Sequence, residues 1–197
     1  MSLVSNLVPL LLIALLCIYA VHNRLTTQVN RFHHAFVHLG IQLKRRHGLA
    51  KELLRSPGIK LSGNHPIVEA LVAANNEAAR CLRLARHRPG EETAMAELTH
   101  AENTLDSALV RLAQMVEHST ELGASKEIKR LLDELGEAEK RITLMSQIFN
   151  GTVMRYNTYK HGVSRVWLAN ALGHRQDATP LGFDDSEMTP QAFQPAF

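Results

Sequence analysis

An apolar segment near the N-terminus constrains the fold of this chain more than any other feature of the sequence. Residues Leu3 to Val21 carry no charged side chain, and a helix needs about 20 such residues to cross the hydrocarbon core of a bilayer. The segment is apolar around its whole circumference, whereas a core helix of a soluble protein has an apolar stripe on one side. We therefore predict a transmembrane anchor over residues 1–22. The residues expected to form it are Leu7, Leu10, Leu11, Leu12, Ile13, Leu15, Leu16 and Ile18.

The charges on either side of this anchor predict its orientation. Residues 1–6 carry no charged side chain, and no small residues at a cleavage spacing end the apolar run, which disfavours a cleaved signal peptide. Arg24, Arg31 and the basic run 44–46 all follow the anchor. Because positive charges flank a membrane span on its cytoplasmic side, we expect the N-terminus outside the cell and the domain that follows in the cytoplasm.

Beyond the anchor, apolar residues recur in steps of three and four, the spacing of amphipathic helices in a bundle. The repeats cover residues 25–53, 67–85, 98–115 and 128–156. Short connections at Ser56-Pro57-Gly58, Arg88-Pro89-Gly90 and Leu122-Gly123 make neighbouring helices run antiparallel. The predicted fold is all-α, with an N-terminal transmembrane helix that continues into an antiparallel four-helix bundle of long helices over residues 23–160.

Two residues are expected to fix the connection before the last bundle helix. Gly123 is predicted to cap the end of the preceding helix, since glycine readily adopts the left-handed conformation that such caps need. Ser125 is predicted to cap the start of the last helix, because a serine hydroxyl accepts a hydrogen bond from an unpaired N–H of the first turn.

The antiparallel arrangement returns the end of the last helix to the level of the bilayer. Residues 161–172 then predict a short amphipathic helix, in which Arg165 and Trp167 suit a membrane interface. A helix that caps the open end of the bundle is an equally good interpretation. From Gly173 the chain is polar and contains several prolines, so residues 173–197 are predicted to be a mostly disordered tail.

Arg46 interrupts the apolar repeat between Leu43 and Ala50. Its aliphatic stem can pack in the core while the guanidinium reaches the surface or pairs with a carboxylate such as Glu139 or Glu134. Ligand binding by this guanidinium is the alternative, and we favour the structural interpretation.

No constellation in the sequence indicates catalysis. Hydrolase motifs such as Gly-x-Ser-x-Gly are absent. The net charge is +3, and basic and acidic residues are interspersed along the chain, whereas nucleic-acid-binding proteins gather basic residues in a patch. His34 and His38 have the spacing of two metal ligands, but the apolar stripe turns them outward and no third ligand is near. We therefore expect no enzyme activity, no cofactor, no bound metal and no nucleic-acid partner. The alternative is a histidine phosphotransfer-like signalling module that uses His100 or His118.

Several motifs occur at the start and in the middle of the first bundle helix, in the last helix and in the tail. They are Asn23-Arg24-Leu25, Gln42-Leu43-Lys44-Arg45-Arg46, Phe149-Asn150 with Val153, Tyr156 and Asn157, and Gly182-Phe183. With these motifs the chain resembles the LemA family of bacterial membrane-anchored proteins. The motif residues of interest are Gln42, Lys44, Arg45, Arg46, Phe149, Asn150, Tyr156 and Asn157. The chain departs from the family at His47 to Leu54, where members carry an aromatic residue and an Asp-Leu-Ile-Pro-Asn-Leu-Val-like run.

The resemblance implies an all-α antiparallel bundle behind a single span of the bacterial cytoplasmic (inner) membrane, with a short N-terminus outside. It implies no catalytic residues. We expect a non-enzymatic scaffold or adaptor that forms homo-oligomers or binds a membrane protein. A membrane metalloprotease is one candidate partner.

Overall fold

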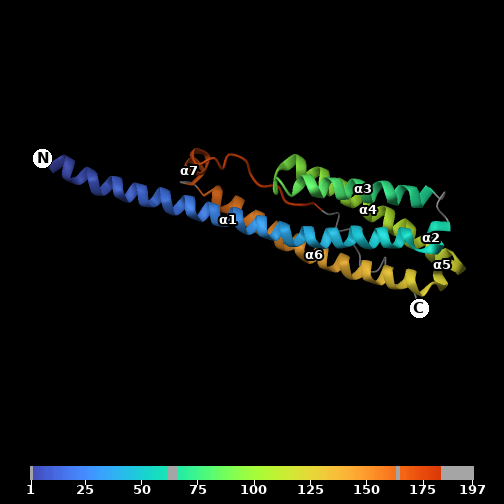
Figure 1. Ribbon diagram of the computed structural model, residues 1–197. Coiled ribbons are helices and arrows are strands. Elements are labelled where there is room, and N and C mark those ends of the chain that lie inside the picture. Colours follow the sequence, from blue (N-terminus) through green and yellow to red (C-terminus); the bar gives the residue numbers. More distant parts are fainter. Residues whose placement is uncertain (1, 62–65, 163–164, 183–197) are drawn as a thin grey trace.

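The computed structural model describes residues 2–61, 66–162 and 165–182, and this part of the chain is helical without a strand. Figure 1 shows a long bundle from which one helix projects at the N-terminal end. The elements are α1 (Ser2–Arg55), α2 (Pro57–Leu61), α3 (Pro66–Ala85), α4 (Glu92–His118), α5 (Thr120–Ala124), α6 (Lys126–Lys160) and α7 (Arg165–Ala171). The predicted all-α bundle is confirmed.

Helix α1 joins the apolar segment to the bundle without a break, as the sequence predicts. By length and composition it can cross a membrane. Its apolar part is exposed on all sides, with exposed fractions from 38% at Ile18 to 69% at Leu10. Burial begins one turn after this part, at Leu25, and continues along one face of the helix. The side chain of Leu7 lies outside the described residues.

Two antiparallel helix pairs build the bundle. Helix α1 packs along α6, α3 packs along α4, and α1 also contacts α3 (Figure 1). The rings of Phe36 and Phe149 meet edge to face at 5.4 Å between centroids, and those of Phe32 and Tyr156 lie 5.5 Å apart. These two contacts fix the register of α1 against α6 along the half of the bundle nearest the apolar segment.

The turn at Gly90 and the cap at Ser125 agree with the sequence predictions, whereas the cap at Gly123 does not. Gly90 has a φ of 84°, the left-handed conformation that glycine tolerates, and it closes the turn between α3 and α4. Ser125 caps α6, because its hydroxyl accepts a hydrogen bond from the backbone N–H of Ile128. The predicted cap at Gly123 is wrong. Helix α4 ends at His118, and the hydroxyl of Ser119 accepts from the N–H of Leu122 to start the separate helix α5.

The tail prediction is wrong for residues 173–182, which run back from α7 over the bundle (Figure 1). Ala178 and Leu181 are buried, and the N–H of Thr179 donates to the carbonyl of Gly90 at 2.8 Å. The polar composition of this segment predicted disorder. The segment is ordered because side chains of α6 form hydrogen bonds with its backbone. Residues 183–197 lie outside the described residues.

Helix α7 packs against α1 and α6 beside the end of the apolar segment (Figure 1). Its Ala169 is fully buried. The side chains of Arg165 and Trp167 lie outside the described residues, so their place at a membrane interface stays a prediction.

Candidate functional site

A cluster of charged side chains lies inside the bundle where α1, α4 and α6 meet. Arg46 of α1 is fully buried, and its Nη1 lies 2.7 Å from Oε1 of Glu139 on α6. Its Nη2 donates to Oε2 of Glu102 on α4. Nη1 is also 3.8 Å from Oδ1 of Asp106, one turn further along α4. His47 completes this ion cluster, with Nε2 3.0 Å from Oε1 of Glu102. One guanidinium thus connects three helices.

Opposite charges favour the ionised forms of Arg46 and Glu102. Burial favours the neutral form of Arg46, but Glu139 and Glu102 outweigh it and raise the pKa of the guanidinium above its ordinary value. Burial likewise disfavours the Glu102 carboxylate, yet Arg46 and His47 hold its pKa below the usual range. Removal of Arg46 would leave the buried carboxylates of Glu102 and Glu139 without the cation that bonds to both.

The sequence prediction for Arg46 is confirmed for Glu139 but not for Glu134, which pairs with Arg130 on the surface of α6. Sequence reasoning missed His47, Glu102 and Asp106. The available signal was the position of the two acids within the apolar repeat of α4, next to Ala101 and Leu105. Because they lie four residues apart on one helix face, both acids can face the same guanidinium.

Two asparagines of α6 hold the segment 173–182, and we call this pair the asparagine clamp. Asn157 donates from Nδ2 to the carbonyl of Ala178 at 2.8 Å, and its Oδ1 accepts from the N–H of the same residue at 3.0 Å. Asn150 makes the same pair of hydrogen bonds with Leu181, each 2.8 Å long. Each amide therefore pairs with the backbone as a neighbouring strand would. The two asparagines are seven residues apart and lie on one face of α6.

A charged contact fixes the start of the same segment. Lys160 at the end of α6 donates to Oδ1 of Asp177 at 2.7 Å and to the carbonyl of Arg175 at 3.0 Å. His161 lies 2.8 Å from Oδ2 of the same carboxylate. The hydrogen bond from Lys160, with that from His161, lowers the pKa of Asp177 below its ordinary range.

The clamp gives a direct prediction for the variant Asn157→Ala. It leaves the N–H and carbonyl of Ala178 without their side-chain partner, a loss of about 1–2 kcal/mol in local stability. Hydrogen exchange measured by mass spectrometry should show the amides of residues 178–182 exchanging about tenfold faster. The matched control is Thr158→Ala, an exposed neighbour on α6 that should leave exchange unchanged. Equal protection in the two variants would contradict the clamp.

The two aromatic motif residues, Phe149 and Tyr156, lie in the bundle core and at the end of the core nearest the apolar segment. Phe149 is fully buried against Phe36. Tyr156 packs on Phe32, and its hydroxyl lies 3.1 Å from Nδ1 of His174 in the tail segment. Burial, together with the nearby Asp177 carboxylate, raises the pKa of Tyr156. These contacts fit a packing role.

The remaining motif residues and histidines are spread over the surface of the bundle. Lys44 and Arg45 are exposed, and Gln42 is half-buried. His34 and His38 point outward from α1, and among the described residues no group of three His, Cys, Asp or Glu side chains is arranged to hold a metal ion. His100 and His118 are both exposed on α4.

The sequence model of the LemA family matches residues 35–191, which is most of the chain. The chain belongs to the LemA family. No curated protein matches it.

The LemA match includes both features described above. Its range 35–191 contains every member of the ion cluster and the asparagine clamp, and it continues through the tail segment. The apolar half of α1 precedes the matched residues. The family match therefore covers most of the bundle together with the segment 173–182 that α6 holds.

Proposed function

We propose that this LemA-family protein is a single-pass protein of the bacterial cytoplasmic membrane that carries its bundle on the cytoplasmic side as a non-enzymatic scaffold or adaptor. The continuous helix α1 carries this proposal. Its first part exposes apolar side chains on every side, and its second part forms one wall of the bundle. Insertion into lipid removes that apolar surface from water, which is strongly favourable.

The continuity of α1 also implies that the anchor positions the bundle relative to the membrane. A helix without a flexible linker holds the domain close to the bilayer and in a limited range of orientations. The excess of arginine and lysine just after the apolar segment supports a cytoplasmic bundle. A protein built in this way acts by positioning partners, and the buried charges described above stabilise the bundle rather than perform chemistry.

We propose two kinds of partner, namely further copies of this chain and a second membrane protein, with a membrane metalloprotease as one candidate. Exposed apolar side chains on the half of α6 nearest the anchor support such contacts, since large apolar residues on a surface favour association. They are Leu144, Ile148 and Met154, with exposed fractions of 53%, 46% and 69%.

The test is the mass of the full-length protein after extraction from membranes in a mild detergent. Mass photometry should show an oligomer or a complex with an identified membrane protein, and Ile148→Ser with Met154→Ser should reduce its share severalfold. Val72→Ser with Leu84→Ser makes a matched control, because these apolar residues of α3 are also exposed. A monomer without a partner would contradict the scaffold and favour the phosphotransfer alternative with His100 or His118.

A further inference from the structure

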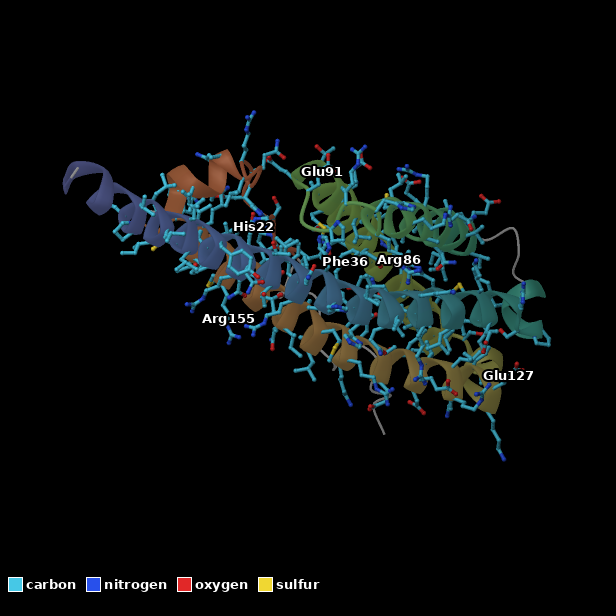
Figure 2. All side chains as sticks on the ribbon, turned by 60° about the vertical axis from the view of Figure 1, so that its left-hand side comes forward. His22, Phe36, Arg86, Glu91, Glu127 and Arg155 are labelled. Carbon is cyan, nitrogen blue, oxygen red and sulfur yellow. The ribbon has the colours of Figure 1, made fainter. Side chains whose placement is uncertain are left out.

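The end of the bundle nearest the apolar segment is rich in positive charge. The turn at Gly90 that joins α3 to α4 lies beside Phe32, since both line one pocket. Of the described residues, those of α1, α6, α7 and the tail segment extend further (Figure 1). In α1 no acidic residue precedes Glu52, and in α6 none follows Glu139. Figure 2 shows His22 and Arg155 at this end and Glu127 at the opposite end.

Two acidic groups near this end, Asp177 and Glu91, have basic partners. Asp177 is bonded to Lys160 and His161, and Glu91 lies 3.4 Å from Arg88 at the turn between α3 and α4. In the part of the chain that the structure describes, no carboxylate pairs with Arg24 or Arg31 of α1. Among the described residues, these two guanidinium groups are therefore open to an anion from outside.

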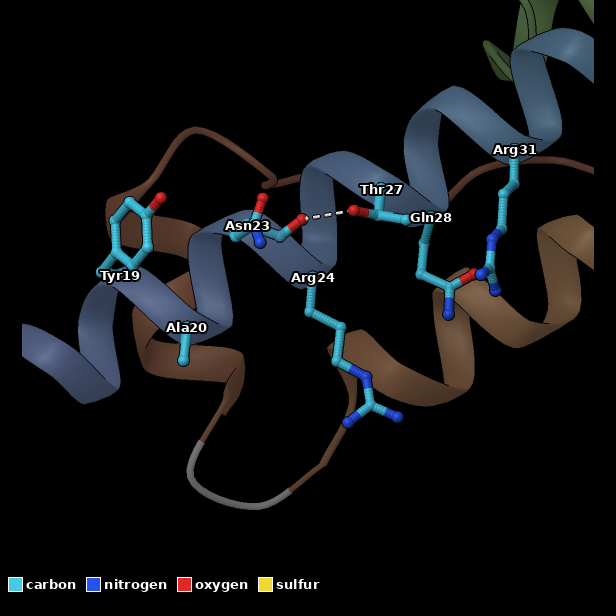
Figure 3. A pocket seen from close by; sticks show the side chains of 7 residues that line it. All are labelled: Tyr19, Ala20, Asn23, Arg24, Thr27, Gln28 and Arg31. Carbon is cyan, nitrogen blue, oxygen red and sulfur yellow. Dashed lines mark hydrogen bonds between the residues drawn. The ribbon is translucent and has the colours of Figure 1, made fainter.

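These two arginines line a shallow pocket of about 480 Å³ on α1, which Figure 3 shows from close by. Its lining consists of Tyr19, Ala20, Asn23, Arg24, Thr27, Gln28 and Arg31. Arg24 and Arg31 are seven residues apart, so they lie on one face with a separation of about 10 Å along the helix axis. Figure 3 shows both side chains extending to the same side of α1, with the amide of Gln28 between them.

A contact with α6 orients one of the two guanidinium groups. The Cζ atom of Arg24 lies 5.0 Å from the centre of the Tyr159 ring, a cation–π contact that restricts the side chain. A guanidinium has planar donors that match the oxygens of a phosphate, and a side chain that is already oriented loses less entropy on binding. The pocket is therefore suited to a phosphate group.

The neighbourhood of the pocket indicates which phosphate compound it takes. Ala20 lies at the edge nearest the anchor, and Leu16 and Ile13 continue its helix face at spacings of four and seven residues. Both are exposed, at 66% and 61%. A ligand held by the two arginines through a phosphate can thus lay an apolar chain along α1.

We propose that Arg24 and Arg31 bind the phosphate of an anionic phospholipid in the leaflet from which α1 emerges. This inference rests on the proposed membrane anchoring. Arg24 follows the apolar segment by three residues, and the two groups that a phospholipid combines, phosphate and acyl chain, match the two parts of this helix face. Bound lipid would then fix the rotation of α1 in the membrane and hence the orientation of the bundle.

The test uses the full-length protein in nanodiscs of phosphatidylcholine with phosphatidylglycerol as the probe. Native mass spectrometry after release from the discs should show phosphatidylglycerol retained in preference to phosphatidylcholine. Arg24→Gln or Arg31→Gln should each lower this preference by about fivefold, as expected for one cation near an anionic lipid surface. The double variant should lower it by more than tenfold, and Arg24→Lys with Arg31→Lys should keep most of it.

The matched control is Lys44→Gln with Arg45→Gln, two exposed cations further along α1 that should leave the preference unchanged. Equal retention of the two lipids, or an equal loss in this control, would overturn the lipid site. Displacement of phosphatidylglycerol by inorganic phosphate at the same concentration would also overturn the lipid site. So would a double variant that retains phosphatidylglycerol as the wild type does but loses an acidic protein partner. Failure of every variant and the wild type to enter nanodiscs would instead overturn the anchor itself.

Discussion

Replacement of Arg46 by leucine is expected to destabilise the bundle by about 3–5 kcal/mol, the cost of leaving buried charges without their partner. The guanidinium is fully buried, and Glu102 and Glu139 bond to it directly. Leucine would fill part of the volume but would leave both carboxylates in the core. Urea unfolding of the full-length protein in detergent, followed by circular dichroism, measures the change in the free energy of unfolding.

Two control variants separate the charge effect from a general effect of substitution in α1. Arg45→Leu changes the exposed neighbour and should alter the free energy of unfolding by less than about 0.5 kcal/mol. The triple variant Arg46→Leu, Glu102→Gln, Glu139→Gln should recover part of the loss, because neutral amides cost less to bury than unpaired carboxylates. Equal stability of the Arg46 and Arg45 variants would show that the ion cluster does not stabilise the bundle.

Two arginines placed in the middle of the apolar segment are expected to remove the protein from the membrane. An arginine at the centre of a transmembrane helix costs about 2.5–3.5 kcal/mol on insertion. Leu12→Arg with Leu15→Arg should therefore shift the partition between membrane and water by a factor on the order of a thousand or more. Immunoblots of carbonate-washed membranes and of the soluble fraction measure this shift.

The same helix provides the control for this experiment. Val37 and Ile41 have exposed fractions of 54% and 51%, almost equal to the 55% and 54% of Leu12 and Leu15, but they lie in the bundle half of α1. Val37→Arg with Ile41→Arg should therefore stay in the membrane fraction. If both double variants remained membrane-bound, the apolar segment would not be the anchor.

The motif residues show where sequence reasoning was sufficient and where it was not. The sequence predicted that Arg46, which lies in the apolar repeat of α1, reaches the surface or pairs with a carboxylate such as Glu139 or Glu134, and the structure shows the pair with Glu139. The contribution of α4 was missed, since Glu102 lies 56 residues from Arg46 and periodicity alone does not give the rotation of one helix against another. The order of residues 173–182 was missed for a similar reason, because the partners of Leu181 and Ala178 lie 31 and 21 residues earlier.

The sequence by itself determined the apolar segment, the four long helices and their antiparallel order, because spacing of apolar residues and helix-breaking turns are local properties of the chain. It also carried the motifs that identify the LemA family. Only the tertiary structure decided which carboxylates meet Arg46, and that the asparagines of α6 bind the tail segment. It also showed that Arg24 and Arg31 line one pocket and that no carboxylate within residues 2–61, 66–162 and 165–182 pairs with them. Hydrogen bonds and ion pairs between distant residues depend on how helices are rotated and packed, which local patterns do not specify.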